Sequence, residues 1–373
     1  MRPTWVEIDL DAIAHNVALI AAEVAPAFLC AVVKADAYGH GDVPVAETAL
    51  ASGASRLAVA LVEEGVRLRE AGIEAPILVL SEPDPGDAGE LSAWGLTPSV
   101  YTTRFVHALA ATGALHNVHL KVDTGMHRVG ADPGHVGGLA DAIAASPNLT
   151  LEAVWTHFAV SEEDADYTAA QIGRLGATLE MLAAAGHHPR LVHAANTAGA
   201  IGRTDARFDM VRAGLGIYGM RPAPATAPHL DLRPAMRVVS HITLLRRLGA
   251  GRRPSYGRRR PLPADAWVAT VPIGYADGVS RRLSAIGGEV LIGGRRHPFA
   301  GRVTMDQVVV DVGDATFDIG DEVVLLGAQG SERISAEEWA GALDTVNYEI
   351  VCRFGPRLPR RYLPFLRTET HHT

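Results

Sequence analysis

A lysine that follows an apolar run is the first candidate for chemistry in this sequence. Residues 29–33 are all apolar, and Lys34 comes directly after them, ahead of a loop that carries Tyr38, Gly39 and Gly41. An amine at the mouth of an apolar layer has a lowered pKa because its charged form loses water, and the neutral amine is a nucleophile and a base. The segment also fits a structural lysine whose amine reaches solvent from a strand end.

The elements around this lysine form an alternating pattern. Short apolar segments predict eight strands, at residues 28–33, 56–61, 76–80, 97–101, 117–122, 151–156, 190–193 and 210–212. Alanine-rich helical patterns lie between them, for example at residues 11–25, 43–51, 63–71, 103–112 and 168–185. Short strands that are apolar throughout are covered on both faces. Eight strand–helix units favour a closed (β/α)8 barrel of the TIM type over a doubly wound open sheet.

The pattern becomes rich in β-strands from about residue 237. Strands are predicted at residues 238–245, 266–272, 289–292, 295–300, 307–312 and 322–326. The only helix expected there is 335–343, with Ser335 as N-cap and Glu338 at the capping-box position. The predicted fold class is therefore α/β plus β. A barrel domain spans residues 9–236, and a mainly-β domain spans 237–373 together with an N-terminal strand, 1–8.

Polar side chains end five of the eight predicted barrel strands, where the catalytic residues of such a barrel lie. They are Lys34 after the first strand, Lys121 and Arg128 at the fifth, His157 after the sixth, Thr197 after the seventh and Arg212 at the eighth. Any one of them alone fits a structural role, such as a core histidine or a salt bridge. Together they predict a cationic pocket for an anionic ligand with a phosphate, a carboxylate or both.

Two loops carry groups that suit a phosphate. Thr197 follows the seventh predicted strand, and Gly214, Leu215 and Gly216 follow the eighth. Hydroxyl and backbone N–H groups converge on phosphate at this place in barrels of this class. A lysine and a phosphate site at the barrel mouth indicate pyridoxal 5′-phosphate (PLP) held as a Schiff base, or a Schiff-base aldolase acting on a sugar phosphate.

Eight motifs occur in order over nearly the whole chain. They are residues 31–41, 121–130 (KVDTGMHRVG), 156–159 (THFA), 211–219 (VRAGLGIYG), 255–257 (SYG), 274–278 (GYADG), 301–307 (GRVTMDQ) and 347–349 (NYE). Together they resemble the alanine racemases. The resemblance implies an N-terminal (β/α)8 barrel, a C-terminal β domain and a head-to-tail homodimer, in which the partner's C-terminal domain completes each active site.

The resemblance also implies catalytic roles. Lys34 resembles the Schiff-base lysine, which is also the base on the D-amino acid face. Tyr256 resembles the base on the opposite face, delivered by the other subunit. Arg212 would face the pyridine nitrogen of PLP, and His157 would lie between Arg212 and the tyrosine.

The remaining roles concern binding. Arg128 would bind the phenolic oxygen of the cofactor and the substrate carboxylate, and Lys121 resembles a lysine that is carbamylated in much of the family and orients this arginine. The phosphate contacts implied are Tyr38, Thr197, Gly214, Leu215 and Tyr348. Tyr275 and Met305 match residues that the partner chain places at the substrate entrance and near the substrate carboxylate, and Asp306 lies beside them.

Three positions depart from the usual family pattern. Thr197 stands where serine is commoner and keeps the hydroxyl. Thr304 stands where many members have cysteine or alanine. Residues 258–260 are three arginines in place of small and aromatic residues, directly after the motif that holds Tyr256.

The function implied is the PLP-dependent racemisation of L-alanine and D-alanine by two bases, supplying D-alanine for the cell wall. One alternative is a racemase of serine or of a broader set of small amino acids. A fold-related amino-acid decarboxylase would need an acidic residue where Arg212 stands. A non-catalytic PLP-carrier protein would lack the long β domain with Tyr256 and Tyr275.

Composition bears on partners and location. The chain has 373 residues and a formal net charge of −8, so no overall field favours nucleic acid or an anionic membrane. No apolar run reaches the roughly 18 residues of a membrane span. Two cysteines, and residues 1–10 without the apolar core of a signal peptide, fit a cytoplasmic protein. The histidine pairs at 187–188 and 371–372 lack metal-site spacing, so no metal is expected.

Overall fold

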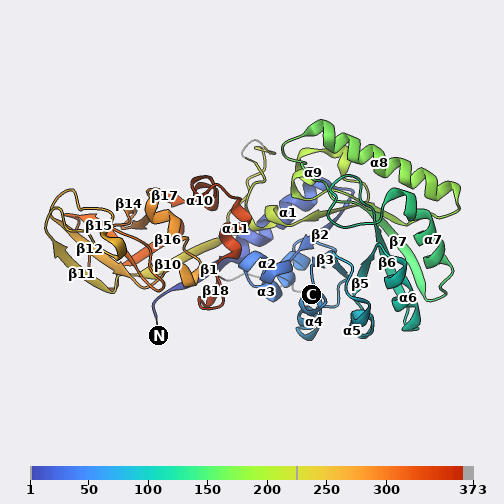
Figure 1. Ribbon diagram of the computed structural model, residues 1–373, viewed down its shortest axis with the longest axis horizontal. Helices are drawn as coiled ribbons and strands as arrows, with labels where there is room; N and C mark the ends of the chain where they lie inside the picture. Colours follow the sequence, from blue (N-terminus) through green and yellow to red (C-terminus); the bar gives the residue numbers. More distant parts are fainter. Residues whose placement is uncertain (1, 224–225, 364–373) are drawn as a thin grey trace, which may run out of the picture. The chain divides into compact units, whose positions relative to one another are not determined.

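The computed structural model describes residues 2–223 and 226–363 (Figure 1). The chain divides into two compact units, which are described separately here. The barrel unit comprises residues 12–37 and 42–233, and the β unit comprises residues 1–11, 38–41 and 234–373. Residues 364–373, including the histidine pair at 371–372, lie outside the described residues.

Eight parallel strands close into a barrel in the order β2 to β9, and the ring closes where β2 pairs with β9. The strands are β2 (Phe28–Val32), β3 (Arg56–Val59), β4 (Ile77–Val79), β5 (Thr97–Val100), β6 (His116–Lys121), β7 (Leu149–Trp155), β8 (Leu191–His193) and β9 (Met210–Ala213). This confirms the predicted (β/α)8 architecture and excludes the open sheet.

Helices cover the outside of the ring, one before the first barrel strand and the others between successive strands (Figure 1). They are α1 (Leu10–Val24), α3 (Asp42–Ala51), α4 (Val62–Glu70), α5 (Ala88–Ala93), α6 (Thr103–Ala111), α7 (Val136–Ala144), α8 (Ala165–Ala184) and α9 (Thr197–Gly202). Caps fix several helix starts, because the side chains of Thr102 and Asp164 accept hydrogen bonds from the backbone three residues on. Most apolar residues of the strands are buried, although Phe28 at the start of β2 is 52% exposed, and this burial explains why the strand segments lack alternation.

The segment after Lys34 differs from the open loop expected there. It forms one helical turn, α2 (Lys34–Gly39), and the four residues from Ala35 to Tyr38 have φ values between 51° and 54°. The turn is therefore left-handed, a conformation that costs about 1–2 kcal/mol for each residue other than glycine.

The β unit contains two sheets. The larger sheet has the order β14-β13-β16-β10-β1-β18, and β17 pairs with β16. Its strands are β1 (Trp5–Asp9), β10 (Met236–His241), β13 (Glu289–Ile292), β14 (Arg295–Pro298), β16 (Glu322–Gln329), β17 (Glu332–Ile334) and β18 (Arg360–Leu363). The smaller sheet is β11 (Leu244–Leu248), β12 (Ala266–Val271) and β15 (Val308–Gly313). The N-terminal strand β1 is antiparallel to β10 and parallel to β18.

Two expectations for this region were wrong. The single strand predicted at 238–245 is two strands, β10 and β11. The Ile242 N–H donates to the carbonyl of Asp321, directly before β16 of the larger sheet, whereas the Thr243 N–H donates to the carbonyl of Thr270 in the smaller sheet. A second helix, α11 (Asn347–Cys352), follows α10 (Ala336–Leu343). Ser335 caps α10 as expected, since its hydroxyl accepts from the Glu338 N–H at 3.1 Å.

None of the described helices combines the length and the apolar character that crossing a membrane requires.

Candidate active site

The left-handed turn that begins at Lys34 is held by a buried carboxylate. The Ala35 N–H donates to Glu64 Oε1 at 2.6 Å. The other oxygen, Oε2, accepts from the N–H groups of Ala60 and Leu61 at 2.8 and 3.2 Å. One glutamate on α4 thus joins the end of β3 to the turn after β2. The sequence analysis did not identify Glu64. Its only sign in the sequence is an acidic residue on the inward-facing side of the helix predicted at residues 63–71.

Lys121, the last residue of β6, is a buried amine among other cations. Its Nζ donates to the Leu80 carbonyl at 3.0 Å and lies 4.2 Å from the centroid of the Trp155 ring. Burial, followed by the charges of Arg212, Arg128 and Lys34, lowers the pKa of Lys121 to about 7. Near neutral pH a large fraction of this amine is therefore uncharged.

Arg212, on β9, is fixed on three sides. Its Nη2 donates to the carbonyls of Thr156 and Ala194, each at 2.9 Å. The guanidinium also lies over Trp155, 4.4 Å from the ring centroid. Burial lowers the pKa of Arg212 to about 9, which leaves it a cation at neutral pH.

His157 contacts this arginine and is a neutral imidazole. Its Nδ1 lies 3.2 Å from Arg212 Nη2. Because a guanidinium only donates, Nδ1 accepts and Nε2 carries the proton. Burial, followed by the charge of Arg212, holds the pKa of His157 well below its usual range. The Nε2–H of His157 is thus a hydrogen-bond donor at this end of the barrel.

The loops after β8 and β9 converge on one hydroxyl. Thr197 Oγ1 accepts from the N–H groups of Gly214 and Gly216 at 3.1 and 3.2 Å, so its own proton is available to another acceptor. A Cβ on Gly216 would lie 2.8 Å from Thr197 Cγ2 and 2.8 Å from Ile20 Cδ1, so only glycine allows this approach. Leu215 begins the turn that follows.

Two tyrosines named in the sequence analysis meet within the β unit. The rings of Tyr38 and Tyr348 have centroids 6.2 Å apart. Burial raises the pKa of Tyr38, so its hydroxyl keeps its proton. Tyr38 therefore presents a phenol and not a phenolate.

The C-terminal candidates lie on exposed loops of the β unit. Tyr256 is 72% exposed, Met305 52% and Tyr275 42%. The Tyr275 N–H donates to the Thr304 carbonyl at 3.0 Å, which ties it to the Met305 loop, and Asp306 pairs with Arg357 at 2.6 Å.

The loop that carries Tyr256 is held in an unusual backbone conformation. Ser255, Gly257 and Arg258 all have positive φ, at 67°, 71° and 44°. The Ser255 hydroxyl donates to the Arg302 carbonyl at 2.6 Å. The phenol therefore projects from a constrained turn, where strain is typical of functional segments.

The structure thus brings the predicted residues together in four groups. Lys34, Lys121, Arg128, His157 and Arg212 share the cationic end of the barrel, as their mutual effects on pKa show. Thr197 joins Gly214 and Leu215, Tyr38 joins Tyr348, and Tyr275 joins Met305 and Asp306. Among residues 2–223 and 226–363, no three histidine, cysteine, aspartate or glutamate side chains group as metal ligands would.

Comparison with known proteins identifies the family. The family model for the alanine racemase N-terminal domain matches residues 8–222, and that for the alanine racemase C-terminal domain matches residues 235–362. The chain belongs to the alanine racemase family. Alanine racemase of Symbiobacterium thermophilum is 47% identical over 369 residues, with 97% of each chain covered. The homologues are isomerases, so this protein is an enzyme of that class.

Solved structures of alanine racemases have the same fold. Alanine racemase of Streptomyces lavendulae is 37% identical, with a TM-score of 0.93 and complete coverage of both chains. Alanine racemase of Bacillus anthracis with bound L-Ala-P is 38% identical, with a TM-score of 0.92 and coverage of 98% of this chain and 96% of that one.

The barrel residues fit PLP, the cofactor that the family implies. A phosphate needs N–H and hydroxyl donors at close approach, and Thr197 with the glycine backbone at 214–216 offers them in a space that a Cβ at Gly216 would fill. The buried guanidinium of Arg212, a cation at neutral pH, suits an anion. Lys34 at the end of β2 supplies an amine on the same end of the barrel.

Proposed function

We propose that this protein interconverts L-alanine and D-alanine with PLP held on Lys34, in the cytoplasm, and supplies D-alanine for the cell wall. The observation that carries the proposal is the cationic barrel end, where Lys34 shares its surroundings with the buried Arg212 and the neutral His157. When bound, PLP supplies an electron-withdrawing ring that makes the α-proton of an attached amino acid more acidic.

Racemisation removes this proton from one face of the α-carbon and returns a proton on the other. Two fixed bases serve a planar centre better than one group that would have to cross it. We assign Lys34 to the face from which D-alanine loses its proton. In its neutral form, the amine of Lys34 is a base.

Tyr256 is assigned to the opposite face, from a second copy of the chain. Its exposure on the β unit leaves it accessible to such a copy. A phenol has an ordinary pKa of about 10, so it needs help to act as a base near neutral pH. Hydrogen bonding from His157 Nε2–H, with Arg212 behind it, would stabilise the phenolate.

Arg212 is assigned to the pyridine nitrogen of the cofactor. As a guanidinium, it would donate a hydrogen bond without readily giving up its proton, which would leave that nitrogen largely unprotonated. Weak electron withdrawal then limits side reactions such as transamination. A decarboxylase needs an acidic partner at this position and strong electron withdrawal, and the arginine on β9 argues against that alternative.

The binding roles follow from the same groups. Thr197, Gly214 and Leu215 would hold the phosphate, with the phenols of Tyr38 and Tyr348 as further donors. Arg128 would bind the substrate carboxylate, oriented by a carbamate on Lys121. We assign the substrate entrance to Tyr275, Met305 and Asp306 of the second copy.

One experiment tests both the activity and the shared site. Purified protein is assayed for racemisation of L-alanine, L-serine and larger amino acids with and without PLP, and we expect L-alanine to be preferred and PLP to be required. Lys34→Ala and Tyr256→Phe chains, each inactive alone, are then unfolded, mixed in equal amounts and refolded together.

If the site is shared, each mixed dimer contains one intact site, and about a quarter of the wild-type activity returns. If Tyr256 serves its own barrel, no mixed dimer contains an intact site and no activity returns. A wild-type protein that shows no PLP-dependent racemisation would contradict the proposed function itself.

A further inference from the structure

A row of buried side chains connects Arg212 with the opposite end of the barrel. Arg212 Nη1 lies 2.6 Å from His193 Nδ1, and His193 Nε2 lies 3.0 Å from His119 Nδ1. His119 Nε2 then lies 3.0 Å from Glu152 Oε2. All four side chains are at most 3% exposed. We call these residues the relay: Arg212, His193, His119 and Glu152.

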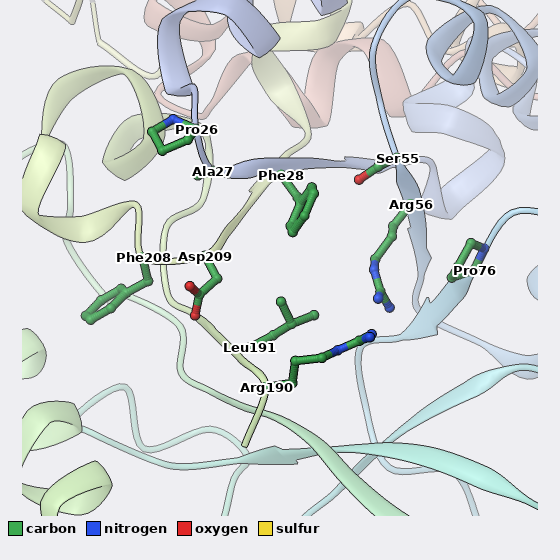
Figure 2. A pocket seen from close by; sticks show the side chains of 10 residues that line it. All are labelled: Pro26, Ala27, Phe28, Ser55, Arg56, Pro76, Arg190, Leu191, Phe208 and Asp209. Atoms are coloured by element: carbon green, nitrogen blue, oxygen red, sulfur yellow. The ribbon is translucent and has the colours of Figure 1, made fainter. Parts of the chain in front are cut away.

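The far end of the relay is fixed by two arginines. Glu152 Oε1 accepts from Arg56 at 2.9 Å and from Arg190 at 2.5 Å, and Oε2 also accepts from Arg56 at 3.2 Å. Both arginines line a pocket of about 640 Å³ at the N-terminal ends of the strands, where their guanidinium groups point toward one another (Figure 2). The relay therefore spans the barrel from this pocket to the candidate active site.

The two ends give the relay one direction. Arg212 can only donate, so His193 Nδ1 accepts and its Nε2 carries the proton. That proton is donated to His119 Nδ1, which leaves the His119 proton on Nε2, facing the carboxylate of Glu152. Burial lowers the pKa of both histidines, and the bonds from His119 and Arg56 hold the pKa of Glu152 well below its usual range. Two neutral imidazoles thus join a cation to an anion.

Stability alone gives little reason for such a row. The interior of this kind of barrel is ordinarily filled by bulky branched apolar side chains. Replacing buried ionic groups by well-packed apolar ones is often neutral or stabilising. All four relay positions hold polar groups. At the active-site end, the hydrogen bonds of Arg212 use only Nη1 and Nη2, and within the described part of the chain its Nε–H donates to no protein acceptor.

We propose that Glu152 is a positioning residue for the reaction: it fixes the tautomers of His119 and His193, and through them the orientation in which Arg212 presents its Nε–H to the cofactor ring. This inference rests on the proposed function for its link to catalysis. The tautomers themselves are a property of the chain and are measured independently.

Glu152→Gln reverses the relay with almost no change of shape. The amide oxygen is expected at the Oε1 position, where Arg56 and Arg190 both donate, so the amide N–H₂ faces His119. His119 Nε2 must then accept a hydrogen bond, so the proton of His119 lies on Nδ1. That proton is donated to His193 Nε2, which places the proton of His193 on Nδ1 as well. A protonated His193 Nδ1 then opposes the N–H of Arg212. The matched control is Arg190→Gln, which removes an exposed donor to the same carboxylate and leaves the relay intact.

The full chain loaded with PLP is labelled with ¹⁵N-histidine, and the imidazole ¹⁵N shifts report each tautomer. We expect unprotonated Nδ1 at both His119 and His193 in the wild type and in Arg190→Gln, and protonated Nδ1 in Glu152→Gln. For Glu152→Gln we also expect kcat for alanine to fall about tenfold, the usual scale for an outer-shell partner, with KM nearly unchanged. The absorbance maximum of the bound PLP should shift.

Unchanged tautomers or an unchanged kcat in folded Glu152→Gln would overturn the proposal. If that variant does not fold, the wild-type spectrum still decides, since a protonated Nδ1 at either histidine contradicts the stated direction. A wild type that has the expected tautomers but no racemase activity would instead reject the proposed function.

Discussion

Replacing Glu64 by glutamine should release the left-handed turn that follows Lys34. In the native chain the carboxylate accepts three backbone N–H groups, one from Ala35 and two from Ala60 and Leu61. Glutamine keeps the shape but has one acceptor. We expect its oxygen to stay with the two donors of Ala60 and Leu61, so that its N–H₂ faces the Ala35 N–H.

The magnitude follows from the contacts. A hydrogen bond to a charged group contributes about 1.5–3 kcal/mol, and a buried N–H without an acceptor costs about 1–3 kcal/mol. The two contributions together predict that the free energy of unfolding falls by about 2.5–6 kcal/mol. The four left-handed residues from Ala35 to Tyr38 cost about 4–8 kcal/mol together, so the loss is large enough to let the turn relax.

The assay is urea unfolding combined with PLP titration. Glu64→Gln should unfold at lower urea and bind PLP more weakly, because Lys34 is the first residue of the turn. Glu63→Gln is the control, since Glu63 is an exposed neighbour on the same helix. Equal unfolding and equal PLP affinity in the two variants would refute the claim that Glu64 holds the turn.

Two further predictions concern the barrel end. Gly216→Ala places a methyl group 2.8 Å from Thr197 Cγ2, so the dissociation constant of PLP, measured by titration, should rise, whereas Gly176→Ala, with open space around it, should leave it unchanged. Lys121 has a pKa of about 7, so its neutral amine, which is the form that reacts with CO₂, becomes the main form as the pH rises through this value. At fixed ¹³CO₂ pressure, a ¹³C carbamate signal should therefore grow above about pH 7 and be absent in Lys121→Met; a signal that falls with pH would contradict this assignment.

Much of the architecture was predictable from the sequence. Buried parallel strands appear as short apolar runs, and each of the eight predicted barrel strands overlaps an observed one. The break between β10 and β11 was not predictable in this way. Residues 238–245 contain no glycine, proline, asparagine or aspartate to mark a turn, yet their backbone hydrogen bonds change from one sheet to the other within this segment.

The candidate site was only partly predictable. Strand ends marked Lys34, Lys121 and Arg212, because the barrel brings such ends to one place. The left-handed turn was missed, since Ala35 to Tyr38 contain no glycine and ordinary propensities exclude that conformation. The relay was also missed, because His119 and Glu152 face one another only through the register of β6 and β7. The individual catalytic roles remain predictions.

The most direct test of the central claim is to locate the covalent attachment of PLP. The protein is reconstituted with PLP, reduced with borohydride, digested and examined by mass spectrometry. We predict the phosphopyridoxyl label on Lys34, at one per chain. A label on another lysine, or no label in a protein that still racemises alanine, would contradict the account.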